Sequence, residues 1–174
     1  YSEMLNRMES VPGVEQATGS WAMPLLMSLW TDEVATDPRA LAEGDLLPRL
    51  AYDMVMPDYH EAMGIPLRRG RFFTPADGPG SEPVVIVSES TASLLWPEDD
   101  AVGKGLKLGT EEEWHTVVGV AGDVKYGGPD SEPRSPIYRP FLQDPGQNGI
   151  RLVLTARTGR DPTELLPQLE EAAR

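Results

Sequence analysis

The sequence predicts an α+β fold, chiefly from residues 83–123. A short β-branched run, Val84 to Val87, is too short for a helix and is typical of a buried strand. Ser88 then offers an N-cap for a short helix that Pro97 ends. Two more strand candidates follow, over 106–108 and 114–120. Strand, helix, strand and strand together form a compact α+β unit.

The flanking regions supply further elements of both kinds. The patterns predict helices over 1–9, over 58–63 and from Asp161-Pro162 onward, and strands over 14–21, 50–56, 137–141 and 150–156. Between 23 and 44 the apolar pieces are short and are interrupted by Pro24 and Asp37-Pro38, so this stretch is predicted to be a long loop. Residues 125–136, rich in Gly, Pro and Ser, are a second predicted loop.

Composition limits the classes of function. The 174 residues, 40% of them hydrophobic, suffice for one domain or two small lobes. With 28 acidic against 15 basic residues the net charge is -13, which argues against a nucleic-acid surface. The chain has no cysteine, so it has no disulfide or thiol chemistry. Helical patterns that are cut at both ends suggest a fragment excised from a longer chain.

The residue types give no catalytic, cofactor-binding or metal site, so we expect a non-enzymatic domain without cofactors. His60 and His115, the only histidines, are interpreted as surface or packing residues. Gly103-Lys104-Gly105 lacks the hydroxyl residue that a phosphate loop requires. The acidic runs 98–100 and 111–113 do not have the spacing of a calcium loop and are interpreted as solvated turns.

Tryptophan placement suggests one partner surface. Trp96 and Trp114 lie in the periodic central unit and are predicted to be core residues. Trp21 and Trp30 enclose an apolar segment, and an exposed patch of this kind would contact a partner or lie near a membrane. The candidate surface comprises Trp21, Leu25, Leu26 and Trp30.

Two other features concern backbone geometry and charge. Arg71 and Asp77 flank a turn-rich stretch, and their signs and spacing suggest an ion pair across it. Gly119 and Gly122 interrupt the last strand of the central unit, which indicates a bulge or the close approach of another backbone.

The order of the motifs resembles the periplasmic core domain of MacB-like ABC transporter permeases. The motifs are Val11-Pro12-Gly13-Val14, Pro57-Asp58-Tyr59, Met63-Gly64-Ile65, Arg69-Gly70-Arg71-Phe72-Phe73 with Asp77, Pro83 to Glu89, Leu95-Trp96-Pro97, Val102-Gly103-Lys104 and Thr116 to Val124. The resemblance covers most of the chain, from about Val11 to the Asp161-Pro162 helix start. The residues of this candidate structural signature are Gly70, Arg71, Asp77, Trp96, Pro97, Gly103, Gly119, Gly122 and Asp123.

The resemblance implies an architecture and a role. It implies a porter-like α/β lobe made from residues 1–66 and 136–174, and an inserted strand-rich lobe at 67–135. The domain would lie on the periplasmic side of the cytoplasmic membrane, between the first two transmembrane helices of an FtsX-type permease. There it would transmit conformational change between the membrane and ATPase parts and the periplasm. Its partners would be its own transmembrane helices and a cytoplasmic ATPase domain or subunit, with a periplasmic adaptor or a second permease copy as further candidates.

Two other classes of function stay open. A small-ligand or peptide-binding extracytoplasmic module would need a pocket with convergent polar groups. An enzyme would need His60 or His115 within hydrogen-bonding reach of a carboxylate in a cleft. The stretch 23–44 fits none of the family motifs and is the candidate region for partner specificity.

Overall fold

The structure, a computed structural model, describes residues 2–22, 29–43, 46–109, 111–124, 136–143 and 152–174. Its helices are α1 (Ser2–Glu9), α2 (Pro38–Glu43), α3 (Tyr59–Ala62), α4 (Glu89–Leu95) and α5 (Pro162–Ala172), with a 3-10 helix η1 (Phe141–Gln143). Its strands are β1 (Val14–Ser20), β2 (Trp30–Ala35), β3 (Arg49–Val55), β4 (Leu67–Gly70), β5 (Val84–Ser88), β6 (Gly105–Leu108), β7 (His115–Ala121), β8 (Ile137–Pro140) and β9 (Val153–Thr158). Within these residues no helix combines the length and the apolar character that a bilayer crossing requires.

The mixed α/β class is confirmed, and local signals explain several element boundaries. Ser88 begins α4 as predicted, because its Oγ accepts a hydrogen bond of 3.3 Å from the backbone N–H of Thr91. Asp161 caps α5 in the same way, with Oδ1 accepting from the N–H of Thr163 at 2.9 Å, and Pro162 occupies the first helical turn.

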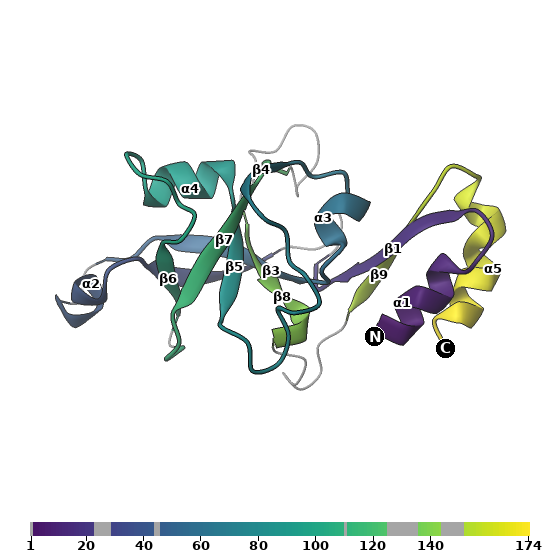
Figure 1. The fold of residues 1–174 in the computed structure, drawn as a ribbon, viewed down its shortest axis with the longest axis horizontal. Coiled ribbons are helices and arrows are strands. Elements are labelled where there is room, and N and C mark those ends of the chain that lie inside the picture. The colour runs from purple at the N-terminus through teal and green to yellow at the C-terminus, as the bar shows by residue number, and fades with distance from the viewer. Residues whose placement is uncertain (1, 23–28, 44–45, 110, 125–135, 144–151) are drawn as a thin grey trace.

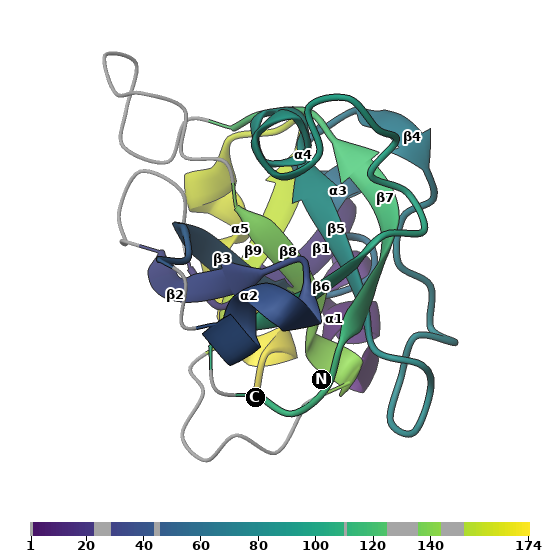
Figure 2. The same ribbon diagram turned by 90° about the vertical axis from the view of Figure 1, so that its left-hand side faces the viewer.

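Six strands form a closed hydrogen-bonded ring. The order along the sheet is β2-β6-β7-β5-β8-β3, and β2 also pairs with β3, so the path returns to its start. The pairs β5–β7 and β3–β8 are parallel, and the other pairs in the ring are antiparallel. β4 pairs with β7 outside this path, and β1 continues from β3 to β9. Figure 2 looks along the molecule onto the ring, with α2 in front and α4 above it.

The ring encloses an apolar core to which every ring strand contributes. Its buried members include Val34 of β2, Val85 of β5, Leu106 of β6, Val117 of β7 and Ile137 of β8. Leu50 and Tyr52 of β3 pack against the same cluster. Three side chains of α4 and its C-terminus, Ala92, Leu95 and Trp96, also pack there. Because α4 follows the end of β5, it covers the end of the ring where β5 ends. It does not cover the opposite end, where β5 begins.

The two terminal helices lie together at the far end of the molecule from α2. Figure 1 shows α1 and α5 side by side against β1 and β9, with both chain ends close to each other. Leu5 and Met8 of α1 are buried in a cluster that also holds Ala17 of β1, Met54 of β3 and Phe141 of η1. Leu169 of α5 packs against that cluster. Apolar packing therefore connects the terminal helices to the ring.

The prediction of a loop over 23–44 is wrong for its second half. β2 and α2 occupy 30–35 and 38–43, while residues 23–28 lie outside the described part of the chain. The strand pairs with β3 and β6, whose sequences lie downstream, so its stability comes from partners that a local pattern does not contain. Asp37-Pro38 marks the start of a helix here, whereas we interpreted it as a break.

Two further expectations differ from the fold. Trp96 and Trp114 are half-buried instead of fully buried in the core, although Trp96 does pack against it. The pairings β5–β8 and β2–β6 join strands from the two predicted lobes into one sheet. The lobe boundaries at residues 67 and 135 therefore do not separate two sheets, and the division into lobes stays a prediction.

Candidate functional site

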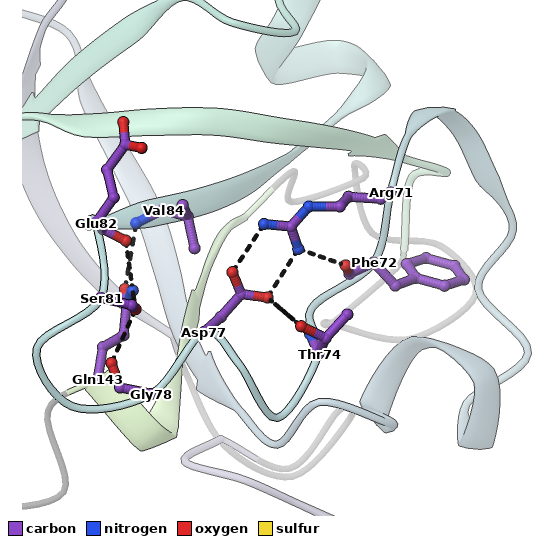
Figure 3. Close-up of polar contacts among 9 residues, drawn as sticks. All are labelled: Arg71, Phe72, Thr74, Asp77, Gly78, Ser81, Glu82, Val84 and Gln143. Carbon is purple, nitrogen blue, oxygen red and sulfur yellow. Dashed lines mark hydrogen bonds and ion pairs between the residues drawn. The ribbon is translucent and has the colours of Figure 1, made fainter.

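The loop at residues 71–83 connects β4 to β5 and contains the predicted Arg71–Asp77 pair, which the structure confirms. Arg71 Nη1 lies 2.7 Å from Asp77 Oδ2, and Arg71 Nη2 lies 2.8 Å from Asp77 Oδ1. Asp77 Oδ2 also accepts hydrogen bonds from the N–H of Thr74 at 2.7 Å and from its hydroxyl at 3.1 Å. Arg71 Nη1 donates in addition to the carbonyl of Phe72 at 3.0 Å. Figure 3 shows these contacts closing the first half of the loop.

Charge and burial make this pair asymmetric. The side chain of Asp77 is 8% exposed and that of Arg71 is 47% exposed. The hydrogen bonds from Arg71 hold the pKa of Asp77 below its usual value, against the opposing effect of burial, and Thr74 lowers the pKa further. The carboxylate is therefore ionised at neutral pH, and its hydrogen bonds to Arg71 and Thr74 hold this part of the loop in place.

Gln143 of η1 holds the second half of the same loop. Its Nε2 donates to Ser81 Oγ at 2.8 Å and to the carbonyl of Glu82 at 2.7 Å. Its Oε1 accepts from the N–H of Val84 at 3.2 Å, and Ser81 Oγ donates to the carbonyl of Gly78 at 2.8 Å. Figure 3 shows this chain of contacts running beside the Arg71–Asp77 pair. One amide side chain of η1 thus holds both the end of the loop and the start of β5.

A cavity of about 630 Å³ lies between this loop and the start of β7. Its lining residues come from three stretches of the chain and are mostly polar: Gly78, Gly80, Ser81, Pro83, Glu111, Glu112, Glu113, His115, Arg139, Pro140 and Gln143. β5 and β7 are parallel and begin at this end, and the antiparallel β8 ends here. The cavity is therefore the mouth of the strand ring at the end that α4 does not cover.

Three charged or titratable side chains meet at the mouth. Arg139 Nη1 lies 2.7 Å from Glu111 Oε1, and the Arg139 side chain is only 12% exposed. His115 Nε2 lies 3.5 Å from Arg139 Nη2 and 3.7 Å from Glu111 Oε2. In strands, alternate residues share a face, so His115 lies on the face of Val117 and Arg139 on that of Ile137. Both side chains therefore lie on the inner face of the ring, next to its apolar core, and make the mouth polar.

The His115 ring is buried, with 4% of its side chain exposed. Burial, followed by the positive charge of Arg139, lowers the pKa of His115 to about 4, so the ring is neutral at pH 7. Its Nδ1 has no hydrogen-bond partner among the residues that the structure describes. The separation of 3.7 Å from Glu111 exceeds hydrogen-bonding distance, so His115 and Glu111 do not form the hydrogen-bonded pair that acid–base catalysis would use.

His60 lies elsewhere, inside a cage of aromatic rings. It is fully buried and stacks on Phe72 with ring centroids 5.1 Å apart, while Tyr138 meets its edge at 4.5 Å. Burial lowers the pKa of His60 to about 4. This placement confirms a packing role. Its helix, α3, buries Tyr59, His60 and Ala62.

The residues of the predicted structural signature gather mainly around β7. Gly70 pairs with Gly119, and a Cβ on either glycine would collide with the carbonyl of Val118 or of Arg71, respectively. This confirms the close backbone approach that the sequence suggested at Gly119. At Gly122 a Cβ would lie 2.9 Å from the ring of Pro66.

The other signature residues are spread over α4 and its neighbours. Asp123 follows β7 and accepts from the N–H of Ser90 at 3.0 Å and from its hydroxyl, so it fixes the first turn of α4. Trp96 and Pro97 end α4. Gly103 lies in the turn before β6 with a positive φ of 84°. These positions fit structural roles. That they form a signature of the family stays a prediction.

The candidate partner surface is described in part. Trp21 and Trp30 stack with ring centroids 4.9 Å apart and an interplanar angle of 9°, and Tyr52 lies 6.1 Å from Trp21. Trp30 is 59% exposed. Leu25 and Leu26 lie outside the described residues. The structure therefore brings the two tryptophans together and leaves one of them largely open to solvent.

The sequence alone did not predict the site at the mouth of the ring. We interpreted Glu111 as part of a solvated turn and gave no role to Arg139 or Gln143. One signal was available, because Arg139 is the single charge within the apolar segment 137–141, and such a charge usually has a partner. In the described parts of the chain no group of three or more His, Asp or Glu side chains is arranged to hold a metal ion.

Comparisons with known proteins identify the family. The family model described as the MacB-like periplasmic core domain matches residues 3–172. The periplasmic region of MacB from Actinobacillus actinomycetemcomitans has a TM-score of 0.65 and 16% identity, over 97% of this chain and 70% of that one. The extracellular domain of the noncanonic ABC-type transporter YknZ from Gram-positive bacteria has a TM-score of 0.65 and 19% identity, over 99% and 79%. No curated protein matches. The chain belongs to the MacB-like periplasmic core domain family, as its motif order indicated.

Proposed function

We propose that this domain transmits conformational change between the membrane and ATPase parts of an ABC transporter permease and the extracytoplasmic side. It performs no reaction of its own and uses no cofactor. Its partners are its own transmembrane helices and a cytoplasmic ATPase domain or subunit. Family membership supports this proposal, because the family is that of MacB-like periplasmic core domains.

The placement of α1 and α5 is the observation that carries the proposal. The two helices pack side by side, and Figure 1 places both chain ends at the same end of the molecule. Two membrane helices that continued from them could enter the bilayer together. Force applied to the pair would reach the rest of the domain through one compact connection.

That connection has both hydrogen-bonded and apolar parts. β1 and β9 pair in an antiparallel ladder from Val14 to Ser20. At its inner end, the N–H of Trp21 donates to the carbonyl of Met54 and the N–H of Met56 donates to the carbonyl of Gly19, each at 2.8 Å. The apolar cluster around Leu5, Met54 and Phe141 joins the helices to β3 and η1. Such packing moves as a unit, which suits a lever that moves as a rigid body.

The stacked pair Trp21–Trp30 supports a second element of the proposal, a contact surface for a periplasmic adaptor or a second permease copy. Exposed tryptophans are enriched at protein interfaces, and Trp30 presents more than half of its surface to solvent. Replacing Trp30 by Ser in the full permease would reduce association with that partner and leave the fold intact. Unchanged association would contradict this assignment.

The lever is tested in the full-length permease by interrupting the connection. We would insert Gly-Gly-Ser after Gly13 and after Gly159, in the two turns between the terminal helices and the β1–β9 pair. This domain has no cysteine, so in a permease whose other cysteines are replaced, a spin label attached through the substitution Glu98→Cys reports on the ring. A second label on the membrane part then gives an ATP-dependent distance. We expect the insertions to abolish this distance change while ATP hydrolysis continues.

The matched control places the same insertion after Asp99, in the exposed turn beyond α4, where it lengthens no connection to the terminal helices. For this control the label is moved to position 68 on the exposed strand β4, and the distance change should persist. A native permease in which the distance stays the same with and without ATP would contradict the proposal. The same conclusion would follow if both insertions left the distance change intact.

A further inference from the structure

The hydrogen-bonded joint between the terminal part of the domain and the strand ring is narrow. β1 pairs with β9 from Val14 to Ser20, and it pairs with β3 of the ring at its last residue, where Ser20 lies opposite Val55. Figure 1 shows β1 and β9 extending together from the ring toward α1 and α5. A displacement of the terminal helices against the ring therefore concentrates at the end of β1, where the chain reaches Trp21.

The backbone at this joint is fixed to β3. The N–H of Trp21 donates to the carbonyl of Met54 at 2.8 Å. The N–H of Ala22 donates to Asp53 Oδ1 at 3.1 Å, and Asp53 is fully buried. Ser20 Oγ donates to the carbonyl of Ala22 at 2.7 Å. Because breaking such buried hydrogen bonds is costly, a displacement at the joint is taken up by the side chain of Trp21.

The indole of Trp21 contacts the packing of the terminal helices and the exposed ring of Trp30. Alternate residues of a strand share a face, so Trp21, one residue beyond β1, lies on the face of Ala17. Ala17 is buried in the same cluster as Leu5 and Met8 of α1, and Trp21 packs against that cluster. Trp21 also stacks on Trp30, with ring centroids 4.9 Å apart and an interplanar angle of 9°. One side chain therefore joins the two regions.

Trp30 belongs to the strand ring. It is the first residue of β2, where it pairs with Tyr52 of β3, and it is 59% exposed. The stack of Trp21 on Trp30 thus crosses from the terminal part of the domain to the ring. Because a stacked arrangement depends on the orientation of both aromatic rings, a rotation of Trp21 changes how Trp30 is supported and which of its faces solvent reaches.

We propose that Trp21 is a positioning residue that couples the terminal helices to the surface around Trp30. Displacement of α1 and α5 against the ring rotates the Trp21 indole and so changes the surface that Trp30 presents. By thermodynamic linkage, a protein bound to Trp30 would in turn bias the position of the terminal helices. The inference rests on the proposed function, because it identifies where the transmitted movement reaches the surface of the domain.

The first test measures the coupling in the 174-residue chain and needs no ATP-driven movement. Two stacked indoles give an exciton couplet in the far-ultraviolet circular dichroism spectrum, and Trp30→Phe identifies the part of the spectrum that comes from this pair. Leu5→Ala removes three carbon atoms from the cluster against which Trp21 packs, so we expect it to reduce the couplet. If Leu5→Ala does not fold, Leu169→Ala in α5, at the edge of the same cluster, replaces it.

Ile65→Ala is the matched control for Leu5→Ala. Leu5 and Ile65 are both 7% exposed, and each substitution removes the same number of carbon atoms. Ile65 belongs to a different cluster, the one that holds Tyr59 and Tyr138, so the couplet should persist in this variant. An unchanged couplet in the folded terminal-helix variant, or an equal loss in both variants, would overturn the inference.

The second test follows Trp30 during the ATP cycle of the full-length permease. The permease is labelled with 5-fluorotryptophan, and Trp30→Phe assigns the Trp30 signal in the ¹⁹F NMR spectrum. We expect ATP to shift this signal in the native permease. Trp21→Ala should abolish the shift, whereas Trp21→Phe, which keeps an aromatic ring in the stack, should retain part of it. The spin label at position 98 should report the same distance change in all three proteins, which shows that the fold and the movement persist.

The inference and the proposed function fail separately. If ATP changes the distance to the ring but leaves the Trp30 signal of the native permease in place, the coupling is wrong and the lever function stands. A shift that persists in Trp21→Ala would also contradict the coupling. If ATP leaves the distance unchanged, the lever function fails, and the couplet of the terminal-helix variant still decides whether Trp21 couples the two regions.

Discussion

Arg71 and Asp77 meet through two parallel contacts, Nη1 to Oδ2 at 2.7 Å and Nη2 to Oδ1 at 2.8 Å. Such a two-point pair fixes orientation as well as distance. We expect Arg71→Ala to lower the free energy of unfolding by about 1–2 kcal/mol, because the nearly buried Asp77 keeps only its Thr74 contacts. Arg71→Lys should recover only part of this loss, since an ammonium group cannot reproduce the fork. Urea unfolding measures both.

Arg68→Ala is the matched control for Arg71→Ala. Arg68 contacts Glu89 at 3.0 Å, but both side chains are about half exposed, at 51% and 45%. An exposed pair of this kind contributes at most about 1 kcal/mol, so the loss should be smaller than at Arg71. Equal losses for the two variants would show that the fork geometry at Arg71 adds nothing.

Acid should weaken the same loop. The pKa of Asp77 is held below its usual value of 3.8, mainly by the hydrogen bonds from Arg71. A lowered pKa in the folded state stabilises the fold above the unfolded-state pKa, and this stabilisation is lost as the pH falls through the folded-state value. The difference in stability between the native chain and Asp77→Asn should therefore be constant above about pH 5 and shrink below about pH 4. A difference that is unchanged at pH 3 would contradict this explanation.

His60 should make the fold sensitive to pH in a different range. Its pKa is about 4 in the folded state against 6.5 for an exposed imidazole, so between these values only the unfolded chain takes up the proton. Stability should fall as the pH drops from about 6.5 to 4, by up to about 1.4 kcal/mol per pH unit for this residue. His60→Phe fits the aromatic cage and removes this dependence.

The measurement for His60→Phe is chemical unfolding at pH 7 and pH 5. We expect the variant to gain stability over the native chain by about 2 kcal/mol more at pH 5 than at pH 7. The remaining slope of the variant reports on His115, which has a similarly lowered pKa. An equal difference at the two pH values would mean that His60 is not held neutral by burial.

Gly119 should tolerate no side chain. A Cβ at this position would collide with the carbonyl of Arg71, which belongs to the backbone and cannot move aside. We expect Gly119→Ala to separate β4 from β7 at the Gly70–Gly119 pair and to cost at least about 2 kcal/mol. Gly105→Ala is the control in β6, where the new Cβ would only touch the Trp114 ring at 3.5 Å. Thermal unfolding should show a large loss for the first variant and a small one for the second.

Gln143 should determine the local stability of the loop and of the cavity wall. Gln143→Glu keeps the shape of the side chain but replaces the amide that donates to Ser81 and Glu82 with a carboxylate. The new oxygen would face the carbonyl of Glu82 and repel it, so the N–H of Val84 should exchange faster with solvent. Hydrogen exchange followed by NMR measures this, with Val117 in the ring core as the unaffected reference. Unchanged hydrogen exchange at Val84 would show that Gln143 does not determine the local stability of the loop.

The sequence patterns correctly predicted those elements whose formation depends on residues close together in the chain. The β-branched run at Val84, the Ser88 cap and the Asp161-Pro162 helix start all appear in the structure, because each depends on neighbouring residues. β2 was missed because its hydrogen-bond partners, β3 and β6, lie far along the chain. Ring closure depends on the same distant pairings, so no periodicity in the sequence could reveal it.

The candidate site was predictable only in part for a related reason. Arg71 and Asp77 are six residues apart, and their pairing follows from sign and spacing. Arg139 and Glu111 are 28 residues apart and meet only after β7 and β8 have joined the same ring. Nothing in the local sequence indicated that Gln143 would reach the loop around Ser81, because that contact spans 62 residues.

The adjacency of α1 and α5 also bears on how such domains can be exchanged. A unit whose two ends emerge together can be removed or replaced without changing the spacing of the segments that it interrupts. We therefore expect grafting of residues 2–174 into a short hairpin of an unrelated host protein to leave both folds intact.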